Sequence, residues 1–268
     1  MIRLLAAIFT LLPLSASALL CRGLAGVWWW ILPIRKRVAV ENLRAAFPEL
    51  PPGPTLRRGF AEALLGYAEL LRHQRRPLPP VEFEGIEPIL ERFRAGQGGL
   101  ILAGHGGAWD LCVVLMVQQL RVPTSVLVRT PSSGAVDRLV RQLRGVADLE
   151  LLPPVDATRR VLAALREGRM VLFLLDQRHN SGIPVPFFGR PAWTSRGLAL
   201  IAARSKVPVF GVWQTRSGLG RHHVRFYPPF ALSGDPEADT AAFSRFYEDR
   251  IRERPYAWLW LHDRWRKP

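Results

Sequence analysis

The chain has 268 residues, of which 49% are hydrophobic and 22% are charged, a composition typical of a globular protein rather than a disordered one. Its 37 Lys and Arg outnumber its 22 Asp and Glu, so the formal charge of +15 favours an anionic partner such as nucleic acid, lipid headgroups or an acidic carrier protein. Only two cysteines are present, Cys21 and Cys112, both in apolar runs, which disfavours a secreted disulfide scaffold.

The first 34 residues predict a membrane anchor. Residues 4–21 form an uncharged run of 18 residues, close to the roughly 20 that cross the hydrocarbon core of a bilayer. A tryptophan triplet at residues 28–30 and a basic triplet at residues 35–37 follow, in the order of an interfacial aromatic belt and a cytoplasmic flank. We therefore expect residues 1–34 to span the bilayer or to lie at its interface, with residues 35–268 in the cytoplasm.

A cleavable signal peptide is the competing interpretation of the same segment. Arg3 would be its positive end, and the small residues at 15–18 resemble a cleavage site. Because the apolar character resumes at once and continues to Leu32, a retained anchor is the preferred interpretation.

The remainder of the chain predicts an α/β fold. An apolar stripe first indicates a helix over residues 55–76, and short apolar runs then alternate with stretches of helical periodicity. The apolar runs lie at residues 99–103, 125–128, 149–152, 170–175 and 207–213. A further strand at 222–226 and a helix at 236–254 are expected. This alternation predicts a central mixed, mostly parallel sheet flanked by helices, with the active site where strands end and loops begin.

The first strand end carries the best candidate for catalysis. The strand runs into a turn containing Gly104, His105, Gly106 and Gly107, and a helix begins near Asp110. On one continuous helix His105 and Asp110 would diverge by about 140°. With the histidine in the turn before the helix, they can converge, and a histidine oriented by a carboxylate is a general base near neutral pH. A capped helix with a structural histidine at its entry is the alternative.

Three further segments carry candidate residues. The strand at 125–128 ends in Arg129, and the strand at 170–175 ends in Asp176. The loop that follows contains Phe187 and Phe188. Taken alone, a strand-end arginine and a capping carboxylate are ordinary surface residues.

In order, these segments resemble the lipid A biosynthesis lauroyl/myristoyl acyltransferase family, within the wider glycerophosphate-type acyltransferases. The resemblance rests on His105-x4-Asp110, the strand ending at Arg129, residues 175–189 and Val-Pro-Val at 207–209. It covers about residues 40–266, including ENLRAAFPEL at 41–50 and WLWLHDRWR at 258–266. That family usually has Glu where this chain has Asp110; the similar phosphatidylinositol mannoside acyltransferases can have Asp there.

The resemblance implies acyl transfer. The donor would be a thioester of acyl carrier protein or coenzyme A, with no further cofactor and no metal. The acceptor would be a hydroxyl of a lipid A precursor or related glycolipid, with residues 35–268 as the catalytic domain on the cytoplasmic face of a bacterial inner membrane. No G-x-S-x-G nucleophile elbow is present, so direct attack is favoured over an acyl-enzyme.

Roles for individual residues follow from the same resemblance. His105 would deprotonate the acceptor hydroxyl with Asp110 as its partner. Backbone N–H groups near Gly106 and Gly107, or Arg129, would meet the oxyanion, unless Arg129 grips an acceptor phosphate instead. Asp176 would position a hydroxyl or an arginine. The candidates for the acyl-chain slot are Trp109, Phe187 and Phe188.

Other functions remain as alternatives. A phosphatidylinositol mannoside-type or lysophospholipid acyltransferase would use the same chemistry. A metal hydrolase built on His105, Asp110, Asp176 and His179 matches no H-E-x-x-H or C-x-x-C spacing. A non-catalytic, basic, membrane-anchored lipid-binding protein is supported by charge alone. Nucleic acid is disfavoured because the chain has no Lys/Arg block interleaved with aromatic residues.

Overall fold

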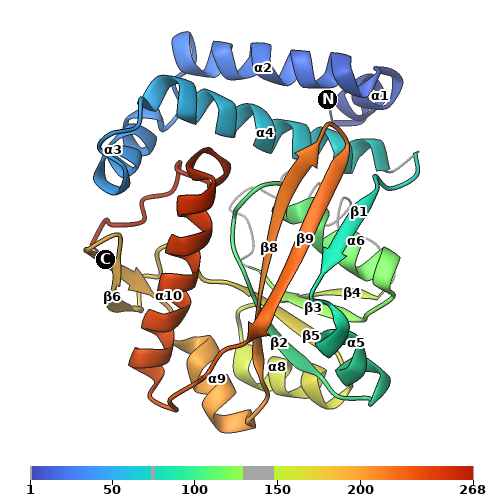
Figure 1. The fold of residues 1–268 in the computed structure, drawn as a ribbon, viewed down its shortest axis with the longest axis vertical. Helices are drawn as coiled ribbons and strands as arrows, with labels where there is room; N and C mark the ends of the chain where they lie inside the picture. The colour runs from blue at the N-terminus through green and yellow to red at the C-terminus, as the bar shows by residue number, and fades with distance from the viewer. Residues whose placement is uncertain (1, 74–75, 129–147, 268) are drawn as a thin grey trace.

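The computed structural model in Figure 1 describes residues 2–73, 76–128 and 148–267, with side chains from residue 7 onward. Its centre is a seven-stranded sheet in the order β1-β9-β8-β2-β5-β3-β4. Every neighbouring pair is parallel except the antiparallel pair of β8 and β9. The strands are β1 (Val81–Glu84), β2 (Gly99–Ala103), β3 (Thr124–Leu127), β4 (Leu149–Leu152), β5 (Met170–Leu174), β8 (Val209–Gly218) and β9 (Arg221–Pro229). The expected α/β fold with a mixed, mostly parallel sheet is confirmed.

Helices cover both faces of the sheet. On β2, Leu100 and Leu102 pack toward α8, α9 and α10, whereas Ile101 and Ala103 pack toward α5 and α6. Because both faces are covered, the central strands are continuous apolar runs rather than alternating ones. The helices are α5 (Glu87–Arg94), α6 (Trp109–Leu120), α8 (Ala157–Arg166), α9 (Gly197–Ser205) and α10 (Pro236–Glu253), followed by a 3-10 turn η1 (Pro255–Ala257). The loop expected after β5 contains the hairpin of β6 (Ile183–Phe187) and β7 (Arg190–Thr194).

Four helices precede the sheet and lie at one end of the molecule (Figure 1). They are α1 (Ile2–Leu11), α2 (Leu14–Trp30), α3 (Lys36–Ala46) and α4 (Pro52–His73). The apolar run at residues 4–21 is therefore not one helix. It breaks at Pro13, which is extended at ψ 149° and has no N–H to continue the helix. Arg72 of α4 donates hydrogen bonds to the carbonyls of Phe9 and Leu12, which the break leaves free.

The expected spanning anchor is not supported. Within the described part of the chain, no helix is both long enough and apolar enough to traverse a bilayer. Part of the segment belongs to the core instead: Trp28 is buried and stacks on Phe60 of α4 at 4.4 Å between ring centroids. Cys21 is also buried, against Leu65 of α4. The tryptophan triplet is thus divided, because Trp30 of the same helix is 73% exposed.

Candidate active site

The glycine-rich turn between β2 and α6 packs directly against strand β8. Gly107 has a φ of +60°, which favours glycine. A Cβ on Gly106 would lie 2.2 Å from the Trp213 ring, and one on Gly107 would lie 2.2 Å from the side-chain oxygen of Gln214. The two glycines therefore allow the backbone to approach β8 closely, and this approach sets the position of His105.

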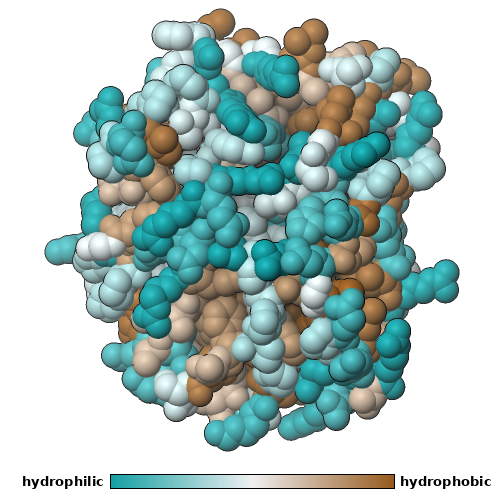
Figure 2. Space-filling view, in the orientation of Figure 1, coloured by the Kyte–Doolittle hydropathy of each residue, from teal (hydrophilic) through white to brown (hydrophobic). Residues whose placement is uncertain are grey.

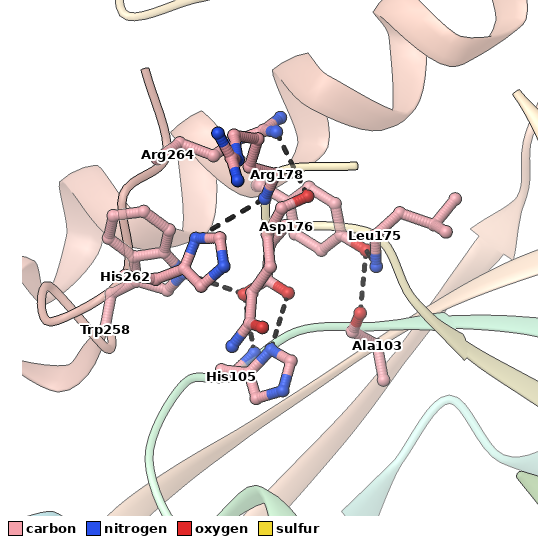
Figure 3. A network of polar contacts seen from close by, with 10 residues as sticks. Ala103, His105, Leu175, Asp176, Arg178, Trp258, His262 and Arg264 are labelled. Atoms are coloured by element: carbon pink, nitrogen blue, oxygen red, sulfur yellow. Dashed lines mark hydrogen bonds and ion pairs between the residues drawn. The ribbon is translucent and has the colours of Figure 1, made fainter. Parts of the chain in front are cut away.

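His105 is paired with Asp176. Ala103 of β2 is in register with Leu174 of β5, and His105 and Asp176 each lie two residues beyond that pair. Adjacent parallel strands thus deliver both residues to the same edge of the sheet. His105 Nδ1 lies 2.7 Å from Asp176 Oδ1, and the His105 backbone N–H donates to Oδ2 at 2.7 Å (Figure 3). Tyr247 ties the two strand ends together, because its hydroxyl donates to Ala103 O and accepts from Leu175 N.

The environment keeps Asp176 ionised. Trp258 Nε1 donates a third hydrogen bond, to Oδ2 at 2.8 Å, and the carboxylate is fully buried. Burial opposes ionisation, but the charge and hydrogen bonds of His105 and the Trp258 N–H bring the pKa of Asp176 below its ordinary value. Since a carboxylate only accepts, Nδ1 is the His105 ring nitrogen that carries a proton toward Asp176.

Buried groups around the pair balance its charge. Arg264 is fully buried and donates to Gln177 O, Trp193 O and Thr194 Oγ1. Burial lowers the pKa of Arg264 to about 10, while the Asp176 charge acts in the opposite direction, so the guanidinium is still a cation at neutral pH. Burial likewise lowers the pKa of His262 to about 4, so this imidazole is neutral there. One cation thus faces one carboxylate at the base of the site.

A second polar network holds the turn from its other side. The Ala108 N–H donates to Gln214 Oε1 at 2.6 Å, and Gln214 Nε2 lies 2.7 Å from His222 Nδ1. Because the Ala108 N–H is a donor only, it directs the carbonyl of the Gln214 amide toward the turn and the NH2 group toward His222. The His222 proton is then on Nε2, 3.3 Å from Glu69 Oε2. Arg216 neutralises Glu69 through two contacts of 2.5 and 2.7 Å.

The predicted site residues have different outcomes. The carboxylate that contacts His105 Nδ1 is Asp176, which we expected to position a hydroxyl or an arginine. We expected Asp110 to be the partner of His105. Asp110 is buried in the first turn of α6, and its part in the reaction stays a prediction. Arg129 lies outside the described residues. Within residues 2–73, 76–128 and 148–267, no group of three or more His, Cys, Asp or Glu is placed to hold a metal ion.

The three residues expected to line an acyl-chain slot are spread over the site. Trp109 is beside His105, with ring centroids 5.3 Å apart. Phe187 is fully buried behind the pair, at 5.6 Å from Trp258, and Phe188 packs on Phe47. An apolar cavity of about 30 Å³ at Trp109 extends between α4 and residues 257–261.

Sequence reasoning missed Trp258, His262, Arg264 and Gln214 as parts of the site. The first three lie in the WLWLHDRWR segment, which we used for the resemblance without assigning roles. A tryptophan and an arginine among aromatic residues were a usable signal for buried hydrogen-bond donors. Gln214 gave no such signal, because its function depends on the close approach of β8 to the turn.

The fold and the pair together define an α/β protein with a carboxylate-paired histidine at the carboxyl edge of its sheet. Residues 2–267 match the family of bacterial lipid A biosynthesis acyltransferases. The chain belongs to that family, and the expected resemblance is confirmed.

Individual relatives come from two groups of acyltransferases. The phosphatidylinositol mannoside acyltransferase of Mycolicibacterium smegmatis is 29% identical over 188 residues, 67% of this chain and 60% of that protein. The lipid A biosynthesis acyltransferase of Haemophilus influenzae is 23% identical over 252 residues, 89% of this chain and 78% of that protein. The phosphatidylinositol mannoside acyltransferase of Mycobacterium tuberculosis is 26% identical over 189 residues, 68% of this chain and 58% of that protein. The matched part thus spans less than two thirds of both mycobacterial relatives.

Proposed function

We propose that the protein transfers a fatty acyl group from a thioester to a hydroxyl of a glycolipid, with His105 as general base. The contact of His105 Nδ1 with the buried Asp176 carboxylate is the observation that carries this proposal. The acceptor hydroxyl gives its proton to Nε2 as its oxygen attacks the thioester carbonyl. Collapse of the tetrahedral intermediate breaks the C–S bond, and the leaving thiolate takes the proton from Nε2.

Two candidates remain for the oxyanion. The Gly107 N–H donates to Ala257 O at 2.8 Å, so it is already engaged. The backbone N–H of Gly106 and the side chain of Arg129 are therefore the groups proposed to meet the developing charge. Gly106 is the better supported of the two, because it directly follows His105 in the turn.

The acceptor is proposed to be a lipid A precursor, with a phosphatidylinositol mannoside as the second candidate. The family match over residues 2–267 supports the first, and the two mycobacterial relatives together with Asp110 support the second. The donor is proposed to be acyl carrier protein or coenzyme A carrying the acyl chain. No cofactor beyond this thioester is proposed.

Membrane attachment at the interface is proposed for the N-terminal helices, on the cytoplasmic face of a bacterial inner membrane. Figure 2 shows apolar side chains along the upper edge of the molecule, where Figure 1 places α1 and α2. The most exposed large apolar residues of this segment are Leu11, Leu19, Trp30, Ile31, Leu32 and Ile34. The basic residues at 35–37 follow them, as expected for an apolar surface that meets anionic headgroups.

Acyl transfer by the purified full-length protein in neutral detergent tests the function. Acyl carrier protein and coenzyme A thioesters would each be offered with a lipid A precursor, a phosphatidylinositol mannoside and a lysophospholipid, and products identified by mass spectrometry. We expect one glycolipid to be acylated, and its identity names the acceptor. Transfer that survives His105→Ala, or no transfer with any pair, contradicts the proposal.

A further inference from the structure

A second, larger cavity of about 770 Å³ lies between α2, α4 and the distal end of β8. Its size is within the range of about 300–1,000 Å³ usual for ligand pockets. Its lining combines small apolar residues with arginines. The lining residues of this basic cavity that the argument uses are Arg22, Gly26, Arg57, Arg58, Ala61 and Leu65.

The basic cavity has no lining residue in the catalytic turn, and it meets the second polar network of the site only through Arg216. Gly66 of α4 faces the catalytic turn: a Cβ added there would lie 2.8 Å from the Ala108 side chain. Arg57, Ala61 and Leu65 line the basic cavity. At 100° per residue, Ala61 is about 140° away from Gly66 around the helix axis. Arg57 and Ala61 thus lie on the side of α4 away from the turn, whereas Glu62 is only about 40° from Gly66.

The charges of the basic cavity are incompletely neutralised. It is lined by four arginines and one carboxylate, a formal balance of 4 − 1 = +3. Arg58 pairs with the lining carboxylate Glu62, and Arg216 is held by Glu69. For Arg22 and Arg57, the described part of the protein offers no carboxylate within 4.0 Å, and both side chains are exposed. Two arginines at the rim are therefore available to an anion.

We propose that the basic cavity binds the phosphate headgroup of an anionic membrane lipid, at a site distinct from the one where acyl transfer takes place. Arg22 and Arg57 supply charged N–H donors from two different helices, and arginine is suited to bidentate contacts with phosphate. The apolar chains of the lipid lie against the apolar part of the cavity lining, to which Ala18, Leu65 and Leu219 contribute. An apolar wall with cations at its rim matches an amphiphile rather than a free anion.

Glycines on α2 provide a variant that fills the cavity without changing its charge. A Cβ added to Gly26 meets nothing within 4 Å, so Gly26→Phe occupies the basic cavity and replaces a helix-destabilising residue. A Cβ added to Gly23 of the same helix also meets nothing within 4 Å, and Gly23 is not among the lining residues, so Gly23→Phe is the matched control.

A second pair of variants tests the charge of the basic cavity. The double variant Arg22→Gln with Arg57→Gln removes two lining cations. Its control is Arg166→Gln with Arg204→Gln, on α8 and α9 at the opposite end of Figure 1.

Binding of dihexanoyl phosphatidylglycerol to the full-length protein in neutral detergent is the measurement. Dihexanoyl phosphatidylcholine and inorganic phosphate serve as comparison ligands. We expect Gly26→Phe and the Arg22/Arg57 double variant each to weaken phosphatidylglycerol binding by about tenfold or more, since each removes charge-assisted hydrogen bonds or the space for the ligand. Both matched controls should bind as the unaltered protein does.

Several results would overturn the inference. Equal affinity for inorganic phosphate would indicate an anion site without lipid specificity, and equal affinity for phosphatidylcholine would remove the role of charge. Loss of acyl carrier protein binding in the arginine variant, with lipid binding intact, would assign the surface to the protein partner. The outcome is independent of acyl transfer: lipid binding by a protein without transferase activity would refute the proposed function and leave this inference standing.

Discussion

Asp176 contacts His105 twice, once at the imidazole Nδ1 and once at the backbone N–H, each at 2.7 Å. A carboxylate that bonds both the ring and the main chain of one residue fixes the side chain relative to the turn that carries it. The ring therefore cannot rotate away without losing a buried, charge-assisted hydrogen bond. This double contact makes Asp176 the first residue to test.

Asp176→Asn should preserve the shape of the site and lower the rate of transfer. The amide removes the negative charge that stabilises the imidazolium, and it permits the wrong tautomer of His105. We expect a fall in kcat on the order of 10³, with little change in KM. Steady-state kinetics with the detergent-dispersed acceptor measure it, and a thermal melt checks the fold. An Asn variant with wild-type kcat would remove Asp176 from the mechanism.

A parallel pair of variants tests Asp110. If this residue assists His105, Asp110→Asn should lose much of the activity and Asp110→Glu should retain more, because Glu keeps the negative charge of the carboxylate. A role limited to the first turn of α6 would cost the Asn variant about 0.3–1 kcal/mol of stability through the helix dipole, with kcat maintained. Comparing kcat and the free energy of unfolding for both variants separates these roles.

The strands could be predicted from the sequence more readily than the site. Runs such as residues 99–103 are buried on both faces, so their apolar character was visible without any neighbour. His105 and Asp176 are 71 positions apart in sequence, and their pairing depends on the register between β2 and β5. Spacing along the chain favoured the local carboxylate Asp110 instead. The burial of Trp28 could not be predicted either, because it depends on a contact between distant segments. Only the packing of Trp28 on Phe60 of α4 distinguishes it from the exposed Trp30.

Gln214→Leu should impair catalysis without touching substrate. The variant leaves the Ala108 N–H without its acceptor and releases one side of the turn that carries His105. Leaving a buried donor unsatisfied costs about 1–3 kcal/mol. We expect kcat to fall about tenfold while KM for the thioester is retained. Gln214→Glu keeps an acceptor for Ala108 and should recover part of the rate; equal losses in both variants would indicate a purely structural role.

The pKa of His262 predicts how stability depends on pH. Its pKa is lowered to about 4 in the folded protein, whereas the pKa of a histidine in an unfolded chain is about 6.5. Between these values the unfolded chain binds a proton that the folded one does not, so stability falls as pH decreases from about 6.5 to about 4. Allowing for partial exposure, the contribution is about 1–3 kcal/mol.

Chemical denaturation of the wild type and of His262→Gln at pH 7 and pH 5 measures this effect. The Gln variant should lose less stability over that interval. His223→Gln is the control, because His223 pairs with Glu84 on the surface at 3.0 Å and its removal should leave the acid-dependent loss in place. Identical slopes for the wild type and His262→Gln would contradict the assignment.

The apolar corner between α2 and α3 should provide the salt-resistant part of membrane attachment. Truncation at Val38 would also remove Trp28 and uncover Phe60, so substitutions of exposed residues give a cleaner test. A variant with Trp30, Ile31, Leu32 and Ile34 changed to Ser removes apolar area that salt does not screen, and leaves the charges that salt does screen. Vesicles of phosphatidylglycerol should retain the wild type at high salt and release the variant as salt rises.

The control for this variant is Val155→Ser with Leu200→Ser, which alters exposed apolar residues in other parts of the surface. It should stay on the vesicles at high salt as the wild type does. Release of the wild type by salt alone would refute attachment by apolar burial.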